Sequence, residues 1–319
     1  MKQHKVIIDT DPGVDDAMAI FAALAQREVD LLGLTTTYGN VSVAQASQNA
    51  LTLLEMAEVQ LPVAQGAYQP LMREPVPFAD FVHGVDGFGD QFLSQPLGQI
   101  ASQSAAEFMV EQVMQQPNEV NLVCIGPLSN LAQALELEPQ LPHKVKQVVI
   151  MGGTLDHRGN VSPVAEANIF ADPHAADKVM AADWPLVMVG LDVTYQVVFD
   201  ADLFADIAAK NAKVGGFLQR AAEYYIDFYR NEHGVQGCHG HDLMALAYVI
   251  NPDWFDTVSG PICVATEGVA TGQTIMKRVA GASYFLDNWE QRPAQQACMQ
   301  VEGEAILRLF RNSLMSDFW

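Results

Sequence analysis

The stretch Val6-Ile7-Ile8-Asp9-Thr10-Asp11-Pro12-Gly13-Val14-Asp15-Asp16 places four aspartates within eight positions, directly after a short apolar strand. Crowded carboxylates repel one another and raise one another's pKa unless a cation compensates them. Carboxylate oxygens are the ligands that Ca²⁺ and Mg²⁺ prefer. Because ligands of open α/β sheets bind outside the carboxyl ends of the strands, this stretch predicts a metal site at the edge of a sheet.

A simpler interpretation exists for part of this cluster. Aspartate favours helix N-termini, where its carboxylate caps exposed N–H groups and complements the helix dipole. The apolar run from Ala17 to Leu24 has helical character, so Asp15 or Asp16 is also explained as a cap. Capping explains one aspartate. It does not explain why Asp9, Asp11, Asp15 and Asp16 occur together, so a metal or catalytic site is favoured.

Composition limits the class of protein. The chain has 319 residues, half of them hydrophobic, with 17 Lys and Arg against 38 Asp and Glu and a net charge of −21. The absence of a basic cluster argues against a nucleic-acid partner. No apolar run is long enough to span a bilayer. The N-terminus lacks the pattern of a signal peptide, and the four cysteines lack metal-type spacing, so we expect a cytoplasmic protein with reduced thiols.

Apolar strands alternate with helical patterns over the first two-thirds of the chain, as in βαβ units. Strands are predicted at 6–8, 31–37, 122–125, 148–151 and 186–191, and helices at 43–57, 105–115, 173–181, 203–209, 217–229 and 242–250, before a more β-like tail. Nearly continuous hydrophobic strands suit a parallel sheet covered on both faces. We therefore predict one α/β domain over residues 1–319, with a mainly parallel, Rossmann-like central sheet flanked by helices.

Five segments carry polar side chains that a buried core does not explain, at residues 9–16, 39–40, 83–90, 160–168 and 238–242. Taken singly, Asn40, His83 and Asn168 are explained as turn or loop residues, and the glycines around His83 predict a mobile loop. Taken together, the segments supply carboxylates for a cation, amides for hydroxyl groups and histidines that can donate a proton. That combination suits a sugar with several hydroxyl groups.

The sequence resembles a known family, the inosine-uridine-preferring nucleoside hydrolases. The resemblance is carried by Asp9-Thr10-Asp11-Pro12-Gly13-Val14-Asp15-Asp16-Ala17, Thr36-Thr37-Tyr38-Gly39-Asn40, Gly126-Pro127-Leu128-Ser129-Asn130, Met151-Gly152-Gly153, Glu166-Ala167-Asn168-Ile169-Phe170-Ala171-Asp172-Pro173 and His241-Asp242. These motifs occur in the family's order and span nearly the whole chain, thinning after about residue 260. The resemblance implies the nucleoside hydrolase fold and, as in many family members, a homodimer or homotetramer.

The resemblance also implies a role for each matching residue. Ca²⁺ would be bound by Asp11, Asp16, Asp242 and the backbone carbonyl of Ile125. The nucleoside substrate would be bound by Asp15, Asn40, His83, Asn160, Glu166 and Asn168, with His83 on the loop beside the base. Asp11 would be the general base and His241 the acid for the leaving group. Two residues depart from the family pattern, Ile125 for Thr and Leu243 for Pro, and neither change removes a ligand.

The implied reaction is hydrolysis of the N-glycosidic bond of a ribonucleoside through a transition state that resembles an oxocarbenium ion. Ca²⁺ acidifies water less than Zn²⁺ does, so a carboxylate base such as Asp11 remains necessary. Histidine titrates near neutral pH and can protonate the departing base, which is the role assigned to His241. Tyr225 and Tyr229 stand one helical turn apart and form either a wall of the base pocket or ordinary amphipathic packing.

Two other functions compete with this one. Phosphatases of the haloacid-dehalogenase type also begin with a strand followed by Asp-x-Asp, here Asp9 and Asp11, but they need a downstream lysine, and this chain is poor in lysine. A non-catalytic nucleoside- or sugar-binding protein would need the same sugar contacts. Such a protein would have no use for a base and an acid on opposite sides of the ring.

Overall fold

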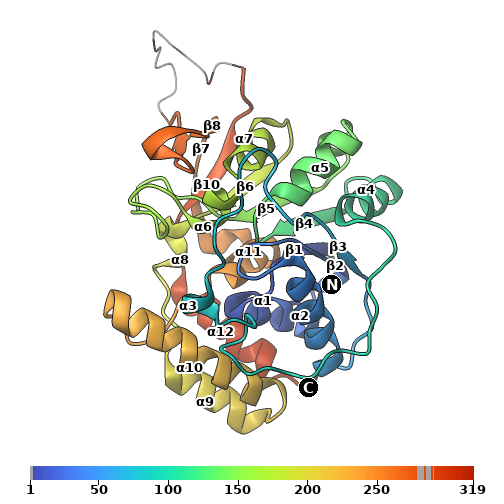
Figure 1. The fold of residues 1–319 in the computed structure, drawn as a ribbon, viewed down its shortest axis with the longest axis vertical. Coiled ribbons are helices and arrows are strands. Elements are labelled where there is room, and N and C mark those ends of the chain that lie inside the picture. Colours follow the sequence, from blue (N-terminus) through green and yellow to red (C-terminus); the bar gives the residue numbers. More distant parts are fainter. Residues whose placement is uncertain (1–2, 279–283, 285–288, 290) are drawn as a thin grey trace.

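The computed structural model describes residues 3–278, 284, 289 and 291–319. Within these residues, eight strands form one sheet in the order β3-β2-β1-β4-β5-β6-β10-β7 (Figure 1). Their bounds are β1 (His4–Thr10), β2 (Val29–Thr36), β3 (Val63–Gln65), β4 (Val120–Cys124), β5 (Gln147–Met151), β6 (Leu186–Val189), β7 (Phe255–Gly260) and β10 (Gln295–Val301). Neighbouring strands run parallel, except that β7 pairs antiparallel with β10. A separate antiparallel pair is formed by β8 (Ile262–Val264) and β9 (Thr274–Met276).

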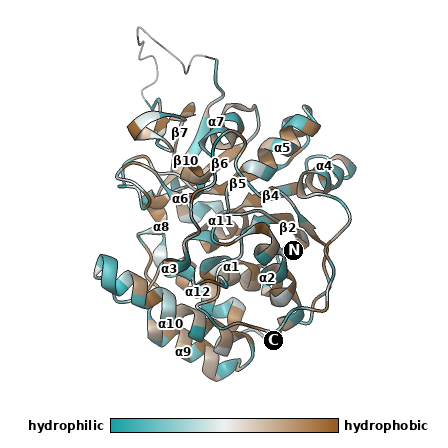
Figure 2. Cartoon of the chain, in the orientation of Figure 1, coloured by the Kyte–Doolittle hydropathy of each residue, from teal (hydrophilic) through white to brown (hydrophobic). Residues whose placement is uncertain are grey.

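Both faces of the sheet are apolar because successive residues of a strand point to opposite sides. In β1, Val6 and Ile8 belong to one core cluster and Ile7 to the other. The same alternation occurs in β4, where Val123 faces the first cluster and Leu122 the second. The hydropathy colouring accordingly shows the central strands in brown (Figure 2). A parallel sheet needs helices over both of these faces.

The helices supply that cover. One face packs against α1 (Val14–Ala25), α2 (Val43–Met56), α9 (Ala201–Lys210), α10 (Val214–His233), α11 (His241–Ile250) and α12 (Gly303–Leu314). The other face packs against α4 (Ala105–Gln115), α5 (Ser129–Leu137) and α7 (Pro173–Ala181). The shorter elements are α3 (Asp80–His83), α6 (Ala167–Ala171), α8 (Leu191–Thr194), η1 (Leu141–His143), η2 (Pro252–Trp254) and η3 (Gly268–Ala270). Among the described helices, none is both long enough and apolar enough to cross a membrane.

The predicted fold class is confirmed, and the five predicted strands correspond to β1, β2, β4, β5 and β6. Several elements were not predicted, among them β3, α5 and α12. β3 has only three residues, too few for a periodic pattern. α12 lies in the tail that was predicted as β-like, although Ile306, Leu309 and Phe310 are buried on one face of it at helical spacing.

The parallel arrangement brings the carboxyl ends of five strands to one edge of the sheet. β1 ends just before Asp11, β2 before Asn40, β4 before Ile125, β5 at Met151 and β6 just before α8. Since ligands of open α/β sheets bind at this edge, the loops that follow these strands define where to look for a site.

Candidate active site

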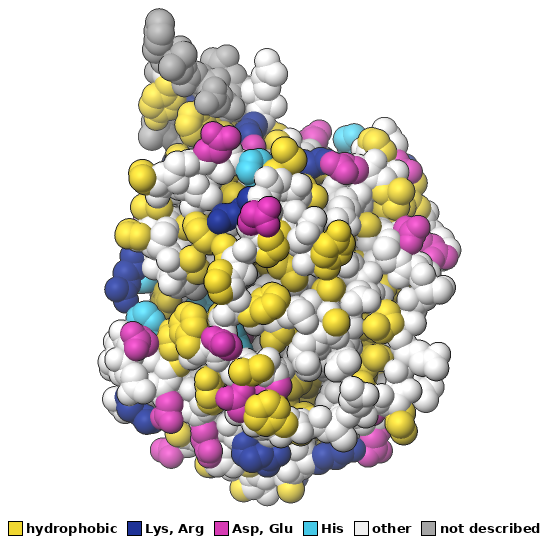
Figure 3. All heavy atoms as spheres, in the orientation of Figure 1, with side chains coloured by type: hydrophobic (Ala, Val, Ile, Leu, Met, Phe, Trp, Pro, Cys, Tyr) yellow, Lys and Arg dark blue, Asp and Glu magenta, His cyan; other side chains and the backbone are white. Residues whose placement is uncertain are grey.

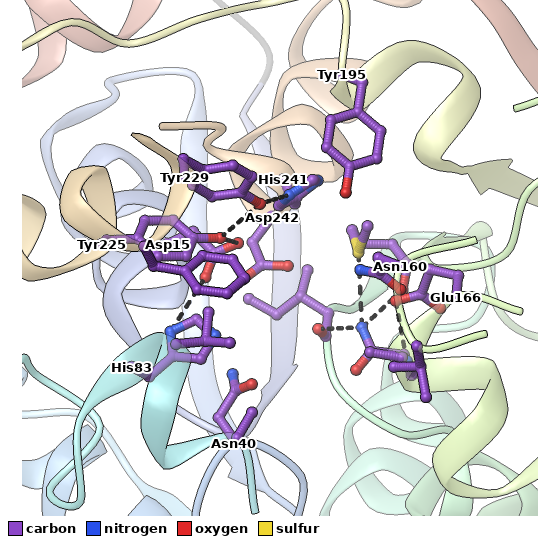
Figure 4. A pocket seen from close by; sticks show the side chains of 18 of the residues that line it. Asp15, Asn40, His83, Asn160, Glu166, Tyr195, Tyr225, Tyr229, His241 and Asp242 are labelled. Carbon is purple, nitrogen blue, oxygen red and sulfur yellow. Dashed lines mark hydrogen bonds and ion pairs between the residues drawn. The ribbon is translucent and has the colours of Figure 1, made fainter. Parts of the chain in front are cut away.

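A cavity opens at the carboxyl edge of the sheet, and most of the predicted site residues line it. They are Asp15, Asn40, His83, Ile125, Asn160, Glu166, Asn168, Tyr225, Tyr229, His241 and Asp242. Figure 3 shows the hollow on this face of the molecule, with histidine side chains inside it. In the close-up, Tyr225 and Tyr229 lie on one wall, and Asn160 and Glu166 lie on the opposite wall (Figure 4). The strands therefore bring together residues that are up to 227 positions apart, from Asp15 to Asp242.

Three carboxylates meet at one end of the cavity. Oxygen atoms of Asp15, Asp16 and Asp242 lie within 4.8 Å of one another, and all three side chains are buried. Burial is the main cause that raises the pKa of Asp15 and of Asp242, and the charge of Asp16 adds to it. Such a group is stabilised by a cation that replaces the lost water, as the sequence predicted for this place.

Asp11 lies beside this group, below the cavity surface. Its Oδ2 accepts a hydrogen bond from the backbone N–H of Asn40 at 2.6 Å, while its Oδ1 is buried and has no hydrogen-bond partner among the described residues. The backbone approaches very closely here, because a Cβ added to Gly39 or Gly126 would lie 2.0 or 2.5 Å from an Asp11 oxygen. An unpartnered buried carboxylate oxygen is costly, and a metal ion would satisfy it.

Asp16 acts as a helix cap and also belongs to the acidic group. Its carboxylate accepts hydrogen bonds from the Thr10 hydroxyl at 2.5 Å, the Gly13 N–H at 2.9 Å and the Asn40 side-chain amide at 3.1 Å. The contact with Gly13 caps helix α1. The same carboxylate belongs to the acidic group, so capping fixes its orientation toward the predicted metal.

Asp9 is placed differently. Its Oδ1 accepts hydrogen bonds from the Thr35 hydroxyl at 2.7 Å and the Asn130 side-chain amide at 2.8 Å. The side chain is fully buried and does not line the cavity, and burial raises its pKa to about 7. Asp9 is therefore held by Thr35 and Asn130 behind the cavity, which argues against the phosphatase alternative, in which the first aspartate of the pair attacks phosphorus.

His83 ends the short helix α3, and side-chain hydrogen bonds hold the glycine-rich loop that follows it. The Asp86 carboxylate accepts hydrogen bonds from the N–H groups of Phe88, Asp90 and Phe92. The Asn49 side-chain amide donates to the carbonyls of Pro12 and Asp86, which ties this loop to the aspartate loop.

The His83 ring is neutral in this position. Its Nδ1 accepts a hydrogen bond from the Val14 N–H at 3.2 Å, and the ring stacks on Tyr225 with centroids 5.1 Å apart. Burial lowers the pKa of His83 to about 3. Its Nδ1 lies 4.0 Å from Asp15, but a neutral ring makes this a polar contact and not an ion pair.

The opposite wall is held by carboxylates and amides that bind backbone groups. Glu166 accepts hydrogen bonds from the N–H groups of Gly153, Asn168 and Ile169 at 2.9–3.0 Å, which caps α6 and fixes the loop after β5. The Asn168 side-chain amide donates to the carbonyls of Ile125 and Met151 at 2.9 and 3.1 Å. The Ile125 carbonyl keeps a second lone pair, so this contact is compatible with the predicted metal contact.

His241 stands at the centre of a chain of side-chain hydrogen bonds. Its Nε2 lies 2.7 Å from the Tyr229 hydroxyl, and its Nδ1 lies 2.7 Å from the Thr194 hydroxyl. Tyr229 and Tyr225 hydroxyls are 3.4 Å apart, and Tyr225 donates to Asp15 at 3.4 Å. Tyr225 and Tyr229 thus face the cavity and are more than amphipathic packing.

The surroundings of His241 disfavour its protonated form. Burial, with the neighbouring histidines, lowers the pKa of His241 well below its usual value. The neutral imidazole is therefore the favoured form of this side chain at neutral pH. A neutral imidazole still carries one N–H, which can be donated to a ligand.

Several residues at the site were missed from the sequence, and three of them matter most here. Tyr195 and Phe228 line the cavity, and Thr194 contacts His241. Tyr195 and Thr194 follow Asp192, a polar residue directly after the predicted strand at 186–191, so the sequence did contain a signal. Phe228 lies between the two tyrosines on α10 and carried no distinguishing pattern.

Comparisons with known proteins agree with this geometry. Residues 6–308 match the family model described as inosine-uridine preferring nucleoside hydrolase. A protein of Arabidopsis thaliana named probable uridine nucleosidase 2 is 38% identical over 99% of this chain and 98% of its own length. Among solved structures, a plant nucleoside hydrolase matches with a TM-score of 0.95 at 34% identity, covering 98% of this chain and 99% of that one. A purine-preferring ribonucleoside hydrolase from Gardnerella vaginalis matches with a TM-score of 0.90 at 31% identity, covering 98% of each chain.

The acidic group predicts stabilisation by a divalent cation. Calcium at about a hundred times its dissociation constant should stabilise the folded state by about 2.7 kcal/mol. For a chain of this size that corresponds to a rise in Tm of roughly 4 °C, measured by calorimetry before and after removal of metal. Asp242→Asn should abolish the rise, and the exposed Asp253→Asn should retain it. An equal rise in both variants would place the cation elsewhere.

The buried His239 predicts a loss of stability in acid. Its Nδ1 donates to the Val197 carbonyl at 2.7 Å, and burial lowers its pKa to about 4. The unfolded chain binds a proton below about pH 6.5 and the folded chain does not, so stability falls as the pH falls from about 6.5 toward 4.

Between pH 7 and pH 5 this residue alone should lower the unfolding free energy by about 1–2 kcal/mol. Urea unfolding of the wild type and of His239→Asn at both pH values measures the difference. The asparagine variant should lose less stability than the wild type, and an identical loss in the two proteins would contradict the assignment.

Proposed function

Since the chain belongs to the family of inosine-uridine preferring nucleoside hydrolases, it is an N-glycosidase that hydrolyses ribonucleosides to ribose and free base, and we propose that the cavity described above is its active site. The observation that carries this proposal is the pairing of two chemistries in one cavity. A buried carboxylate group lies at one end, and His241 with its hydrogen-bonded tyrosines lies on the side wall (Figure 4).

We propose Ca²⁺ as the cofactor, bound by Asp11, Asp16, Asp242 and the carbonyl of Ile125. Three observations support this site: the clustered oxygens of Asp16 and Asp242, the unpartnered Oδ1 of Asp11, and the exclusively oxygen-containing ligand set. Hard oxygen ligands in flexible number favour Ca²⁺ over transition metals. Asp15 also lies within the clustered group and lines the cavity. When bound, the ion orients water and the ribose hydroxyls and offsets the carboxylate charge.

The ribose would lie between the two walls of the cavity. Asp15 and Asn40 approach from the metal side, and Asn160, Glu166 and Asn168 approach from the loop after β5. The Asn40 side-chain amide is oriented by its hydrogen bond to Asp16. Amide and carboxylate groups fixed in this way bind hydroxyl groups without reorganising, which helps to hold the sugar in a reactive geometry.

The reaction adds the elements of water across the glycosidic bond. Asp11 accepts a proton from the attacking water, and the hydroxyl forms the new bond to C1′ of the ribose. The bond from C1′ to the base nitrogen breaks with both electrons leaving on the base, which gains a proton from the side of His241. The buried carboxylates of Asp11 and Asp15 stabilise positive charge that develops on the sugar.

The base would occupy the aromatic part of the cavity. Tyr225, Tyr229, Phe228 and Tyr195 line this part, with His83 stacked behind Tyr225. Aromatic walls bind the faces of purines and pyrimidines alike. Relatives of this chain carry names of both kinds, a uridine nucleosidase and a purine-preferring hydrolase. We therefore propose inosine and uridine as the first substrates to compare.

The assembly and location stay predictions from the sequence, a cytoplasmic homodimer or homotetramer. Several exposed apolar side chains on the segment before α4 support self-association. They are Tyr68, Met72, Phe81, Phe92 and Leu97, which are 66–92% exposed. Large exposed apolar groups in one segment are typical of surfaces that contact another protein.

The first prediction concerns the reaction and the metal together. Release of reducing sugar from inosine, uridine, cytidine and adenosine should occur with Ca²⁺ and should stop after chelation. Adding Ca²⁺ back should restore it, which controls for damage by the chelator. Sugar release that continues unchanged in the chelator would contradict the metal-dependent mechanism, and phosphate release from a phosphomonoester would favour the phosphatase alternative.

The second prediction concerns His241. A general acid contributes about 10²–10⁴-fold to rate, so His241→Ala should lower kcat for inosine by that order. The same variant should cleave p-nitrophenyl β-D-riboside nearly as well as the wild type, because nitrophenolate leaves without a proton. KM for the nitrophenyl riboside should change little, since the sugar contacts remain. Unchanged turnover of inosine would remove His241 from the mechanism.

A further inference from the structure

Thr194 was not expected at the site, because it neither lines the cavity nor belongs to the acidic group. It ends the short helix α8 after β6, and its side chain is fully buried. Its Oγ1 lies 2.7 Å from Nδ1 of His241, on the side of the ring that faces away from Tyr229. Within the described part of the chain, the Thr194 hydroxyl makes no other hydrogen bond.

The donor and the acceptor of each hydrogen bond in this chain can be assigned by starting from Asp15, at the end opposite Thr194. In the structure the Tyr225 hydroxyl donates to the Asp15 carboxylate. The Tyr225 oxygen is then free to accept from Tyr229, and the Tyr229 oxygen is free to accept from Nε2 of His241. Nδ1 of His241 is then an acceptor, and the Thr194 hydroxyl donates to it.

The opposite direction leaves a buried donor without an acceptor. If Nδ1 carried the hydrogen, it would donate to Thr194, and the Thr194 O–H would have no acceptor among the described residues. The Tyr225 oxygen would also lose its donor, since Tyr229 would donate to His241 instead. Unsatisfied buried donors are costly, so the first direction is favoured.

We propose that Thr194 is a positioning residue that fixes the tautomer of His241, with its hydrogen on Nε2 facing the cavity. This inference rests on the proposed function, in which His241 donates a proton to the leaving base. Nε2 gives its proton to the base and regains one from solvent, into which Asp11 releases the proton that it took from the attacking water, so the ring ends neutral. The Thr194 hydroxyl continues to donate to Nδ1. Histidines in catalytic sites depend in this way on the partner of their other nitrogen.

A pair of variants isolates the hydroxyl from the shape of the side chain. Thr194→Val keeps the volume and removes the hydroxyl, and Thr194→Ser keeps the hydroxyl. With inosine, Thr194→Val should lose about ten- to a hundredfold in kcat, a part of the general-acid contribution of about 10²–10⁴. Thr194→Ser should stay within about threefold of the wild type in kcat by the same reasoning. With p-nitrophenyl β-D-riboside, both variants should match the wild type.

A direct reading of the tautomer does not depend on activity. In ¹⁵N-histidine-labelled protein, the nitrogen shifts of His241, assigned by their loss in His241→Ala, should show protonated Nε2 and bare Nδ1 in the wild type and in Thr194→Ser. Thr194→Val should shift that signature toward the other tautomer or a mixture. Thermal melting with and without Ca²⁺ confirms that each variant is folded and keeps its acidic group.

The outcomes separate this inference from the proposed function. A wild type that releases no sugar from inosine would contradict the proposed function, whatever the nitrogen shifts show. An active wild type with equal kcat for inosine in Thr194→Val and Thr194→Ser would overturn the role of Thr194. Equal losses of Thr194→Val with both substrates would also overturn it, because that pattern indicates general damage to the site.

Discussion

The rest of this site depends on one constraint, which is that four carboxylates are buried close together. Asp11, Asp15, Asp16 and Asp242 share one region at the edge of the sheet, and burial raises the pKa of each. Such a group persists only because rigid elements hold it: strand β1 and helix α1 on one side, and the start of α11 on the other. The parallel sheet is the frame that brings these elements to one edge.

The same chain uses other acidic side chains to fix its loops. Asp86, Glu166 and Asp192 each accept hydrogen bonds from three backbone N–H groups within loops at the cavity edge. Charge-assisted bonds of this kind are stronger than neutral ones. Loops that are rich in glycine and short of secondary structure are thereby ordered. Part of the net charge of −21 therefore comes from buried carboxylates that hold loops in place, in addition to charge on the surface.

The sequence predicted the fold, and most of the candidate residues that local patterns and the family resemblance supplied line one cavity. Apolar strands ending in polar residues predicted the sheet edge, and the motifs around Asp11, Glu166 and His241 supplied the candidates. What could not be predicted depends on packing between distant segments. The neutral state of His241 results from burial by α8, α10 and α11 together, and the contact with Thr194 joins residues 47 positions apart. The order of the His83 loop depends on Asn49, a helix residue with no pattern of its own.

Gly39 and Gly126 leave the space that the Asp11 carboxylate occupies, although neither has a side chain that could take part in the chemistry. Each lies against the Asp11 carboxylate so closely that any side chain would displace it. Asp11 has no room to move away, because Asn40 and the neighbouring aspartates surround it. A side chain at either position should therefore disturb Asp11, although neither glycine lines the cavity. A mutational scan of the protein should therefore find intolerant positions beyond the reacting groups. They are glycines whose missing side chains leave room for the Asp11 carboxylate.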